Sequence, residues 1–190
     1  MPAKPGERKL QILQTLAAML ENPKGEKITT AALADRLDVS EAALYRHFAS
    51  KAQMFEGLIE FIEQTLFGLI NKITSEEKSG LKQAEAILSM LLGFAVKNPG
   101  MTRVLIGDAL VNEDERLQAR INQLHDRLEA TVKQALRFAA SEKEIDGSID
   151  PTAQANLMLA FVVGRWHQFA KSGFQRDPTE YWSAQWQGMI

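Results

Sequence analysis

The sequence predicts an all-α protein in which a small N-terminal three-helix unit precedes a larger helical bundle, with about nine helices in all. Apolar residues recur at helical spacing along almost every segment, and no segment shows the alternation that marks a strand. Clusters that contain Pro, Gly, Asn or Asp separate these segments. An apolar fraction of 45% and a charged fraction of 24% suit a folded globular chain of 190 residues.

The N-terminal part contains three predicted helices. The first spans residues 7–21, and residues 22–25 (NPKG) break it. The second and third are short, at about 29–37 and 40–47, with the turn DVS at 38–40 between them. The apolar face of the first helix is formed by Leu10, Leu13, Leu16, Ala17 and Leu20. The residues spaced to pack the short helices against it are Leu33, Leu37, Val39, Leu44 and Phe48.

The C-terminal part is expected to form longer helices. They are predicted at about 51–74, 81–97, 113–140 and 151–171, with a short helix at 101–110 and a final one from about 178. Residues 98–100 (NPG) form a break, and Asp150 followed by Pro151 is a favourable helix start. One apolar stripe of the helix at 113–140 is formed by Leu117, Ile121, Leu124, Leu128, Val132 and Ala135. We therefore expect two domains, residues 1–50 and residues 51–190.

Residues 28–51 carry the most informative functional pattern. Two short helices joined by a tight turn are typical of a helix-turn-helix unit, whose second helix enters the major groove of DNA. Thr29 and Thr30 can cap the first short helix and offer hydroxyls to a phosphate. Ser40 can cap the second short helix. The alternative is a three-helix packing motif with no role in DNA binding.

The residue types of the second short helix suit a DNA-binding face. Tyr, His and Lys side chains suit phosphates, which position a protein on DNA, whereas Arg46 or a residue of the first turn is the candidate for base contacts. The predicted DNA-binding residues are Thr29, Thr30, Ser40, Glu41, Ala42, Ala43, Tyr45, Arg46, His47 and Lys51. Net charge adds modest support. Residues 1–51 carry eight Lys/Arg and six Asp/Glu, for +2, and the remainder carries fourteen and eighteen, for −4.

The sequence contains no catalytic or metal-binding pattern. The histidines His47, His125 and His167 are far apart and lack the HxxxH and HExxH spacings. There is no G-x-S-x-G and no glycine-rich phosphate loop. The absence of cysteine excludes disulfides and thiolate metal sites. We therefore expect no enzyme activity, no metal and no cofactor, and we expect His125 to lie on the polar side of its helix.

Membrane insertion and secretion are not expected either. The first 15 residues contain no apolar segment of the kind found in a secretory signal. The longest strongly apolar run, residues 86–96, is too short to span a bilayer.

The segment VSEAALYRHF at 39–48, followed by SK and MF, resembles the signature of the TetR family of regulators. Segments such as LLGFAVKNPGMTRVLIGDAL and RLQARINQLHDRLEA further resemble the nucleoid occlusion factors of that family. The resemblance covers most of residues 8–140. It implies an all-α homodimer with an N-terminal domain that binds a palindromic site in double-stranded DNA. It also implies that the DNA-bound protein, on the nucleoid in the cytoplasm, inhibits ring assembly by FtsZ through its C-terminal tail.

The same resemblance implies where the FtsZ tail binds, between the predicted helices at 51–74 and 81–97. Phe61, Gly93 and Asn98 match the family pattern there. Three residues depart from it, because Lys97 stands where arginine is usual, Leu69 where a basic residue is common, and Met90 where leucine is common. These departures leave less positive charge and no bidentate guanidinium for an acidic peptide.

Helical spacing in the same two helices leaves alternatives open. The predicted core stripe of the helix at 51–74 is Leu58, Ile59, Ile62, Leu66, Leu69, Ile70 and Ile73. Phe61 and Phe67 fall outside this stripe, which indicates either a helix covered on several sides or, for Phe61, a groove for a partner. Gly93 in mid-helix indicates the close approach of a backbone, either from a partner or from inside the subunit.

The last two predicted helices are rich in aromatic residues, at positions 161, 166, 169, 181, 182 and 186. Such clusters suit a helix–helix interface, and the family resemblance implies a dimer there. An aromatic core within one subunit is the alternative. At the level of function the alternatives are a TetR-type repressor that a small molecule releases from DNA, and a purely structural helical adaptor.

Overall fold

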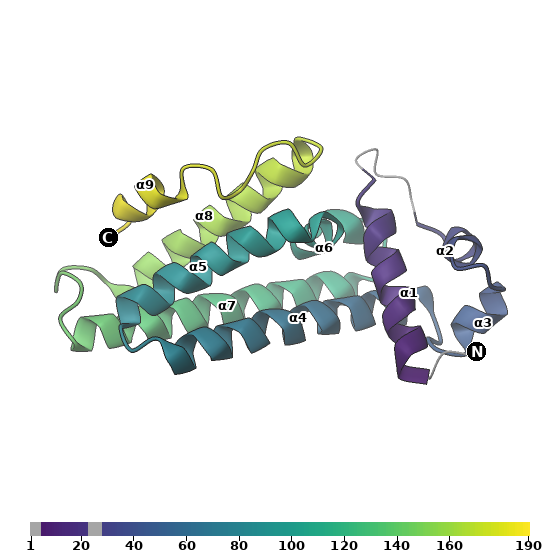
Figure 1. Ribbon diagram of the computed structural model, residues 1–190, viewed down its shortest axis with the longest axis horizontal. Coiled ribbons are helices and arrows are strands. Elements are labelled where there is room, and N and C mark those ends of the chain that lie inside the picture. Colours follow the sequence, from purple (N-terminus) through teal and green to yellow (C-terminus); the bar gives the residue numbers. More distant parts are fainter. Residues whose placement is uncertain (1–4, 23–27) are drawn as a thin grey trace. The chain divides into compact units, whose positions relative to one another are not determined.

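The computed structural model describes residues 5–22 and 28–190, and every regular element in them is helical (Figure 1). This confirms the predicted all-α fold. The α-helices of the described residues are α1 (Pro5–Leu20), α2 (Thr30–Arg36), α3 (Glu41–Tyr45), α4 (Lys51–Glu76), α5 (Gly80–Lys97), α6 (Pro99–Leu105), α7 (Glu115–Ser141), α8 (Pro151–Lys171) and α9 (Trp182–Gln187). A 3₁₀ turn, Asp108–Leu110, lies between α6 and α7. Most of the predicted break at 22–25 lies outside the described residues.

The chain forms two compact units. One consists of residues up to Ile62 together with Asn98–Ile121, and the other consists of Glu63–Lys97 together with Asn122–Ile190. The division runs through α4 and α7, so each of these helices contributes its first part to one unit and its remainder to the other.

In the first unit α1 buries one face, as predicted, but not with the whole predicted set. Leu13, Leu16, Ala17 and Leu20 are buried, and so is Ile12, whereas Leu10 is exposed. The C-terminal end of α1 is held by Arg103 of α6. The Arg103 guanidinium donates to the carbonyl oxygens of Leu20 at 3.1 Å and Asn22 at 3.3 Å, and to the Asp108 carboxylate at 2.8 Å. This arginine satisfies carbonyls that the end of a helix leaves open.

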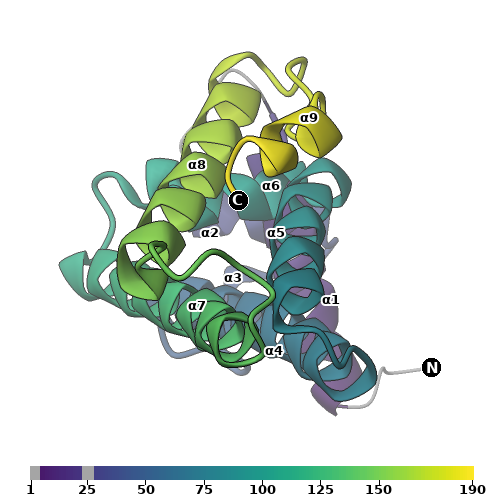
Figure 2. The ribbon, with the colours of Figure 1, turned by 90° about the vertical axis from the view of Figure 1, so that its left-hand side faces the viewer.

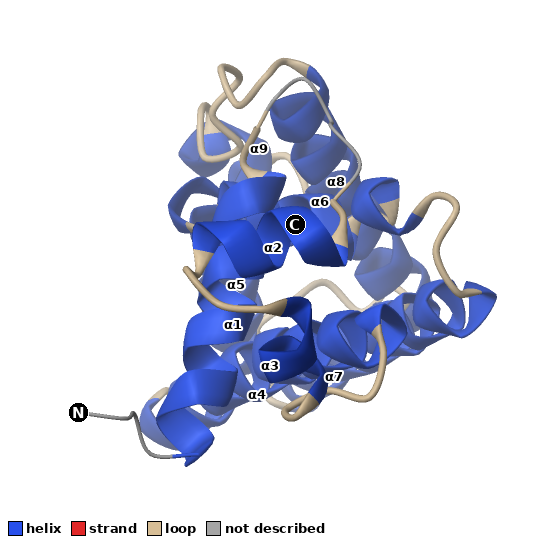
Figure 3. Cartoon of the chain, turned by 90° about the vertical axis from the view of Figure 1, so that its right-hand side faces the viewer, coloured by secondary structure: helices blue, strands red, loops and turns tan. Residues whose placement is uncertain are grey.

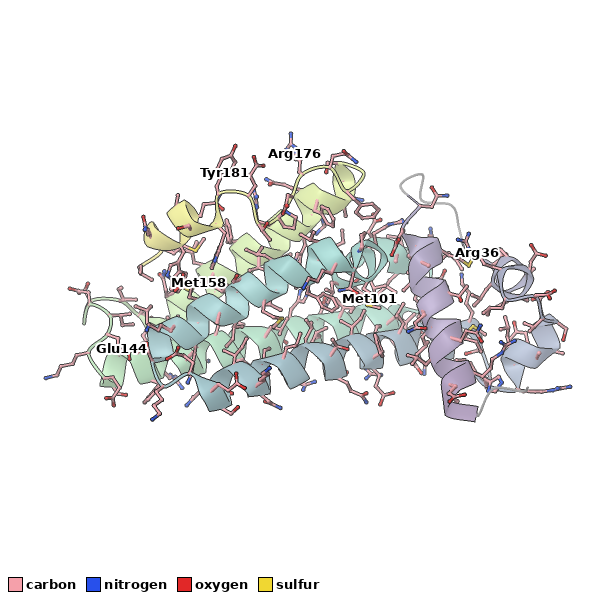
Figure 4. All side chains as sticks on the ribbon, in the orientation of Figure 1. Arg36, Met101, Glu144, Met158, Arg176 and Tyr181 are labelled. Carbon is pink, nitrogen blue, oxygen red and sulfur yellow. The ribbon has the colours of Figure 1, made fainter. Side chains whose placement is uncertain are left out.

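In the second unit the remaining parts of α4 and α7 surround a common core with α5 and α8 (Figure 2). All six residues of the predicted α7 stripe are buried, and four of them, from Leu124 onwards, belong to this unit. Trp166 of α8 is fully buried, and its indole N–H donates to the Leu91 carbonyl of α5 at 3.1 Å. At one end of the unit, Glu144 accepts from the Ser79 hydroxyl at 2.9 Å and the Leu81 N–H at 2.8 Å, which fixes the start of α5 (Figure 4).

The short helix expected at 101–110 is interrupted. Helix α6 ends at Leu105, and Gly107 adopts a left-handed conformation with φ +77° before the 3₁₀ turn. The final helix also begins later than predicted, at Trp182, because the connection from α8 forms a series of turns as far as Tyr181. Arg165 donates to the carbonyl oxygens of Asp177, Pro178 and Glu180, and Tyr181 projects from this connection (Figure 4).

Two further predictions are wrong. Leu69 was expected in the core stripe of α4, but its side chain is 41% exposed. His125 was expected on the polar side of α7, but it is half-buried and its ring centroid lies 6.1 Å from that of Trp166. In both cases the helix forms where it was predicted. The position of the neighbouring helices decides which of its side chains are covered.

Candidate nucleic-acid interface and partner-binding surface

Helices α2 and α3 form the predicted helix-turn-helix, with a tight turn between them (Figure 3). Asp38 takes a left-handed conformation with φ +53°, and the Val39 N–H donates to the Ala34 carbonyl at 3.0 Å. Both predicted caps are present. The Thr29 hydroxyl accepts from the Ala32 N–H at 3.1 Å, and the Ser40 hydroxyl accepts from the Ala43 N–H at 3.3 Å. These short local bonds fix where each helix begins.

The packing of this unit leaves one side of α3 open to solvent. Leu33, Ala34, Leu44 and Phe48 are buried, and Leu37 and Val39 are half-buried. On the open side Glu41, Ala42, Tyr45 and Arg46 are exposed, whereas Ala43 and His47 are half-buried. Cationic and aromatic side chains therefore reach solvent along one helix, as contact with a DNA groove requires.

A polar network joins the start of α2 to α3. The Thr30 hydroxyl donates to the Glu41 carboxylate at 2.6 Å, and the Tyr45 hydroxyl donates to the Thr30 oxygen at 3.5 Å. The sequence pattern did not reveal this network, because the three residues were assigned separately to the DNA face. Its effect is to fix the orientation of α3 relative to α2.

Helix α4 begins with its own cap, which positions Lys51. The Ser50 hydroxyl accepts from the Gln53 N–H at 3.1 Å, and the Gln53 side-chain oxygen accepts from the Ala49 N–H at 2.9 Å. The Lys51 ammonium lies 2.5 Å from the Glu113 carboxylate, with side chains that are 22% and 14% exposed. No spacing rule connects residues 62 positions apart, so sequence reasoning missed Glu113.

The residues after Glu113 add further charge. The side chain and the backbone N–H of Arg116 donate to the Asp114 carboxylate. These bonds lower the pKa of Asp114 to about 2. The pKa of the Arg116 guanidinium is raised, chiefly by Asp114 and to a smaller extent by the negative charge of Glu56. Asp114 is thus ionised throughout the physiological range.

The residues assigned to tail binding lie on α4 and α5 and directly after α5. Met90, Gly93 and Lys97 share one outward side of α5, because they are spaced by three and four residues. Lys97 is exposed, and Met90 and Gly93 are half-buried. These three residues and Leu69 belong to the second unit, whereas Phe61 and Asn98, both half-buried, belong to the first.

Packing inside the subunit does not account for the glycine at position 93. A Cβ added to Gly93 would meet no atom within 4 Å, and the same holds for Gly68 of α4 and Gly164 of α8. By contrast, a Cβ on Gly80 would lie 2.4 Å from the Ala139 backbone nitrogen. The close approach of a backbone from inside the subunit, one of the two explanations left open for Gly93, is therefore wrong.

Phe67 has an internal partner. The Arg127 guanidinium lies 4.1 Å from the centre of its ring and also binds the Glu63 carboxylate at 3.2 Å. A cation over an aromatic face at this distance is favourable. For Phe67 the structure therefore agrees with a helix covered on several sides.

The aromatic residues of α8 and α9 divide between core and surface. Trp166, Phe169 and Trp186 are buried, which matches the alternative of an aromatic core within one subunit. Phe161 and Trp182 are half-buried, with ring centroids 6.3 Å apart. The outward side of α8 is instead formed by Ala153, Leu157, Ala160 and Gly164, and Leu157 is 55% exposed.

The described residues form neither a metal-binding cluster nor a membrane-spanning helix. Over residues 5–22 and 28–190, no three His, Cys, Asp or Glu side chains gather as a metal site would require. No helix in this part of the chain has the length and apolar character needed to cross a membrane.

Two family models match the chain. The model for bacterial regulatory proteins of the tetR family matches residues 25–58, and the SlmA-like model for the tetracyclin repressor-like C-terminal domain matches residues 78–190. The first match contains α2, α3 and the beginning of α4.

Full-length relatives match as well. The nucleoid occlusion factor SlmA of Alteromonas mediterranea is 55% identical over 187 residues, which cover 98% of this chain and 96% of that protein. The SlmA of Idiomarina loihiensis is 54% identical over 182 residues, which cover 96% and 93%.

Solved structures share the fold. The fatty acid degradation regulator FadR from Bacillus halodurans has a TM-score of 0.79 at 12% identity, covering 100% of this chain and 96% of that chain. The TetR family regulator PfmR from Thermus thermophilus has a TM-score of 0.76 at 20% identity, covering 94% and 96%. At these identities the likeness shows the fold alone.

Proposed function

Because this chain belongs to the SlmA family of nucleoid occlusion factors and carries a TetR-type DNA-binding domain, we propose that it binds specific chromosomal sites and, when so bound, inhibits assembly of FtsZ. The single observation that carries this proposal is 55% identity to a nucleoid occlusion factor over 98% of the chain. The family is one of regulatory DNA-binding proteins and not of enzymes. Nucleoid association in the cytoplasm follows from the proposed DNA binding.

In the proposed complex, residues 1–50 form the DNA-binding domain and α3 enters the major groove. Arg46 contacts base edges, because it is exposed on the open side of α3 and its guanidinium can bind guanine at two points. Tyr45, His47 and Lys51 contact phosphates and set the register. Thr30 and Glu41 act mainly by holding α3 in place, since they bond to each other.

A homodimer would present two copies of α3 to a palindromic site. The outward side of α8 supports this arrangement, because Leu157 is exposed beside small residues that let another helix approach closely. At Gly164 there is open space where a side chain would be. Residues 51–190 would thus serve both dimerisation and partner binding.

The FtsZ tail is proposed to bind along α4 and α5, at Phe61, Leu69, Met90, Gly93, Lys97 and Asn98. Exposure of Lys97 on the side of α5 that carries Gly93 supports this, since an acidic peptide would bind there through charge and close backbone approach. The apolar Leu69, exposed at 41%, would offer contact area where a relative would offer charge.

In this scheme DNA must act as an activating ligand, which requires that it bind more tightly to the state of the protein that binds FtsZ. A ligand with equal affinity for two states does not shift the equilibrium between them. The test is binding of a labelled FtsZ-tail peptide to the purified protein, with and without DNA selected from a random pool. Tighter tail binding or stronger inhibition of FtsZ assembly in the presence of the selected DNA is expected. Specific DNA binding without any response to FtsZ would contradict the proposal and favour a repressor released by a small molecule.

A further inference from the structure

Lys51 is a proposed phosphate contact that is already occupied by a carboxylate of its own chain. It is the first residue of α4, and its ammonium lies 2.5 Å from Glu113, which directly precedes α7. The Glu113 side chain is only 14% exposed. A pair this sheltered is screened less by salt than a pair on an open surface.

The surroundings of this pair disfavour an approaching phosphate. Glu113, Asp114 and Glu115 follow one another, and Glu56 of α4 acts on the same guanidinium as Asp114. Lys51 is bound to Glu113 and Arg116 is bound to Asp114, so both of these cations already hold a carboxylate. A lysine beside such a cluster can bind a phosphate only if it leaves its carboxylate or if the phosphate joins an acidic site.

We propose that Glu113 is a determinant of DNA affinity that competes with the DNA phosphate for Lys51. This inference rests on the proposed contact between Lys51 and the DNA backbone. Phosphate contacts supply essentially all sequence-independent binding, so a carboxylate that occupies one of their lysines lowers binding to any DNA. Glu113 therefore keeps the protein off the large excess of non-specific sites, where base contacts from α3 do not compensate.

The exchange of partners also has a structural consequence. When Lys51 turns to a phosphate, Glu113 loses its ion pair, and the connection at 106–114 loses a tie to the start of α4. Formation of the DNA complex thus loosens the segment that leads into α7.

The test compares Glu113→Gln with wild type in binding to non-selected duplex DNA over a series of salt concentrations. One additional phosphate contact is expected to raise affinity about fivefold near 0.15 M salt and to steepen the slope of log K against log salt by about 0.9. Glu115→Gln is the matched control, because it removes the same charge two residues away without touching Lys51. Its effect should be much smaller.

The double variant Lys51→Gln/Glu113→Gln should bind like Lys51→Gln alone, because the effect acts through Lys51. Unchanged or weaker binding by folded Glu113→Gln would overturn the inference, and so would an equal gain in the Lys51→Gln background. Should Glu113→Gln not fold, amide exchange of wild-type residues 106–114 decides: faster exchange with DNA is expected, and unchanged exchange overturns the inference. A wild type that binds no DNA would instead overturn the proposed function itself, and this inference with it.

Discussion

Gly100 lies directly against the carbonyl oxygen of Ala17. A Cβ added to Gly100 would be 2.0 Å from that oxygen, which is closer than any such contact in a folded protein. The residue thus lets the backbone of α6 approach that of α1, and Arg103 one turn later bonds to the carbonyls at the end of α1. The helix on which α2 packs is therefore fixed at its C-terminal end by α6.

Replacing Gly100 with alanine should destabilise the protein. The new methyl group would force apart two backbones that cannot move independently, which corresponds to a loss of about 1–3 kcal/mol in unfolding free energy. Chemical denaturation measures this change. Gly68→Ala is the control, because open space surrounds that helical position and alanine should there add about 1 kcal/mol. Equal stability changes for both variants would contradict the packing described for α1 and α6.

Replacing Gly93 with alanine should separate folding from partner binding. The isolated protein should gain about 1 kcal/mol of stability, because a helical glycine with no neighbour is replaced by a better helix former. Binding of the FtsZ-tail peptide should weaken, because the methyl group would occupy the space proposed for the peptide backbone. Gln134→Ala, on the exposed surface of α7, should change neither property by much. A tail affinity that does not respond to Gly93→Ala would argue against the proposed surface.

Reversing the charge of Lys97 should weaken tail binding and leave DNA binding intact. An exposed ion pair contributes about 0.2–1 kcal/mol, and reversal adds repulsion, so a threefold to tenfold loss is expected, very roughly, from Lys97→Asp. Fluorescence polarisation with the tail peptide measures the loss. Lys82→Asp makes the same change near the other end of α5 and serves as control. Full tail affinity in Lys97→Asp would remove Lys97 from the proposed site.

Replacing Gly164 with leucine should dissociate the proposed dimer without unfolding the subunit. The position is exposed and empty in the single chain, so the larger side chain harms nothing there, but it would keep a second α8 at a distance. Light scattering should report a dimer for wild type, a monomer for Gly164→Leu and a dimer for Gly68→Leu. A wild-type monomer at micromolar concentration, or an unchanged dimer in Gly164→Leu, would refute this interface.

Features that depend on a few consecutive residues could be predicted from the sequence. The hydroxyls of Thr29 and Ser40 and the carboxylate of Asp150 each accept from an N–H two or three residues later, as their positions before apolar helices indicate. The stripe of α7 is buried throughout because its spacing follows the helical repeat. The outward side of α3 follows from the same repeat, once the buried Leu44 and Phe48 are known.

The sequence by itself thus determined the helices, their caps and the helix-turn-helix, because each is a matter of periodicity and local hydrogen bonds. Only the tertiary structure decided which distant residues meet and which predicted site residues are available. It pairs Lys51 with Glu113, places Gly100 against Ala17, and leaves Leu69 exposed. The physical reason is that these relationships join or separate helices far apart in the chain, and a helical repeat specifies the direction of a side chain but not the neighbour that it meets.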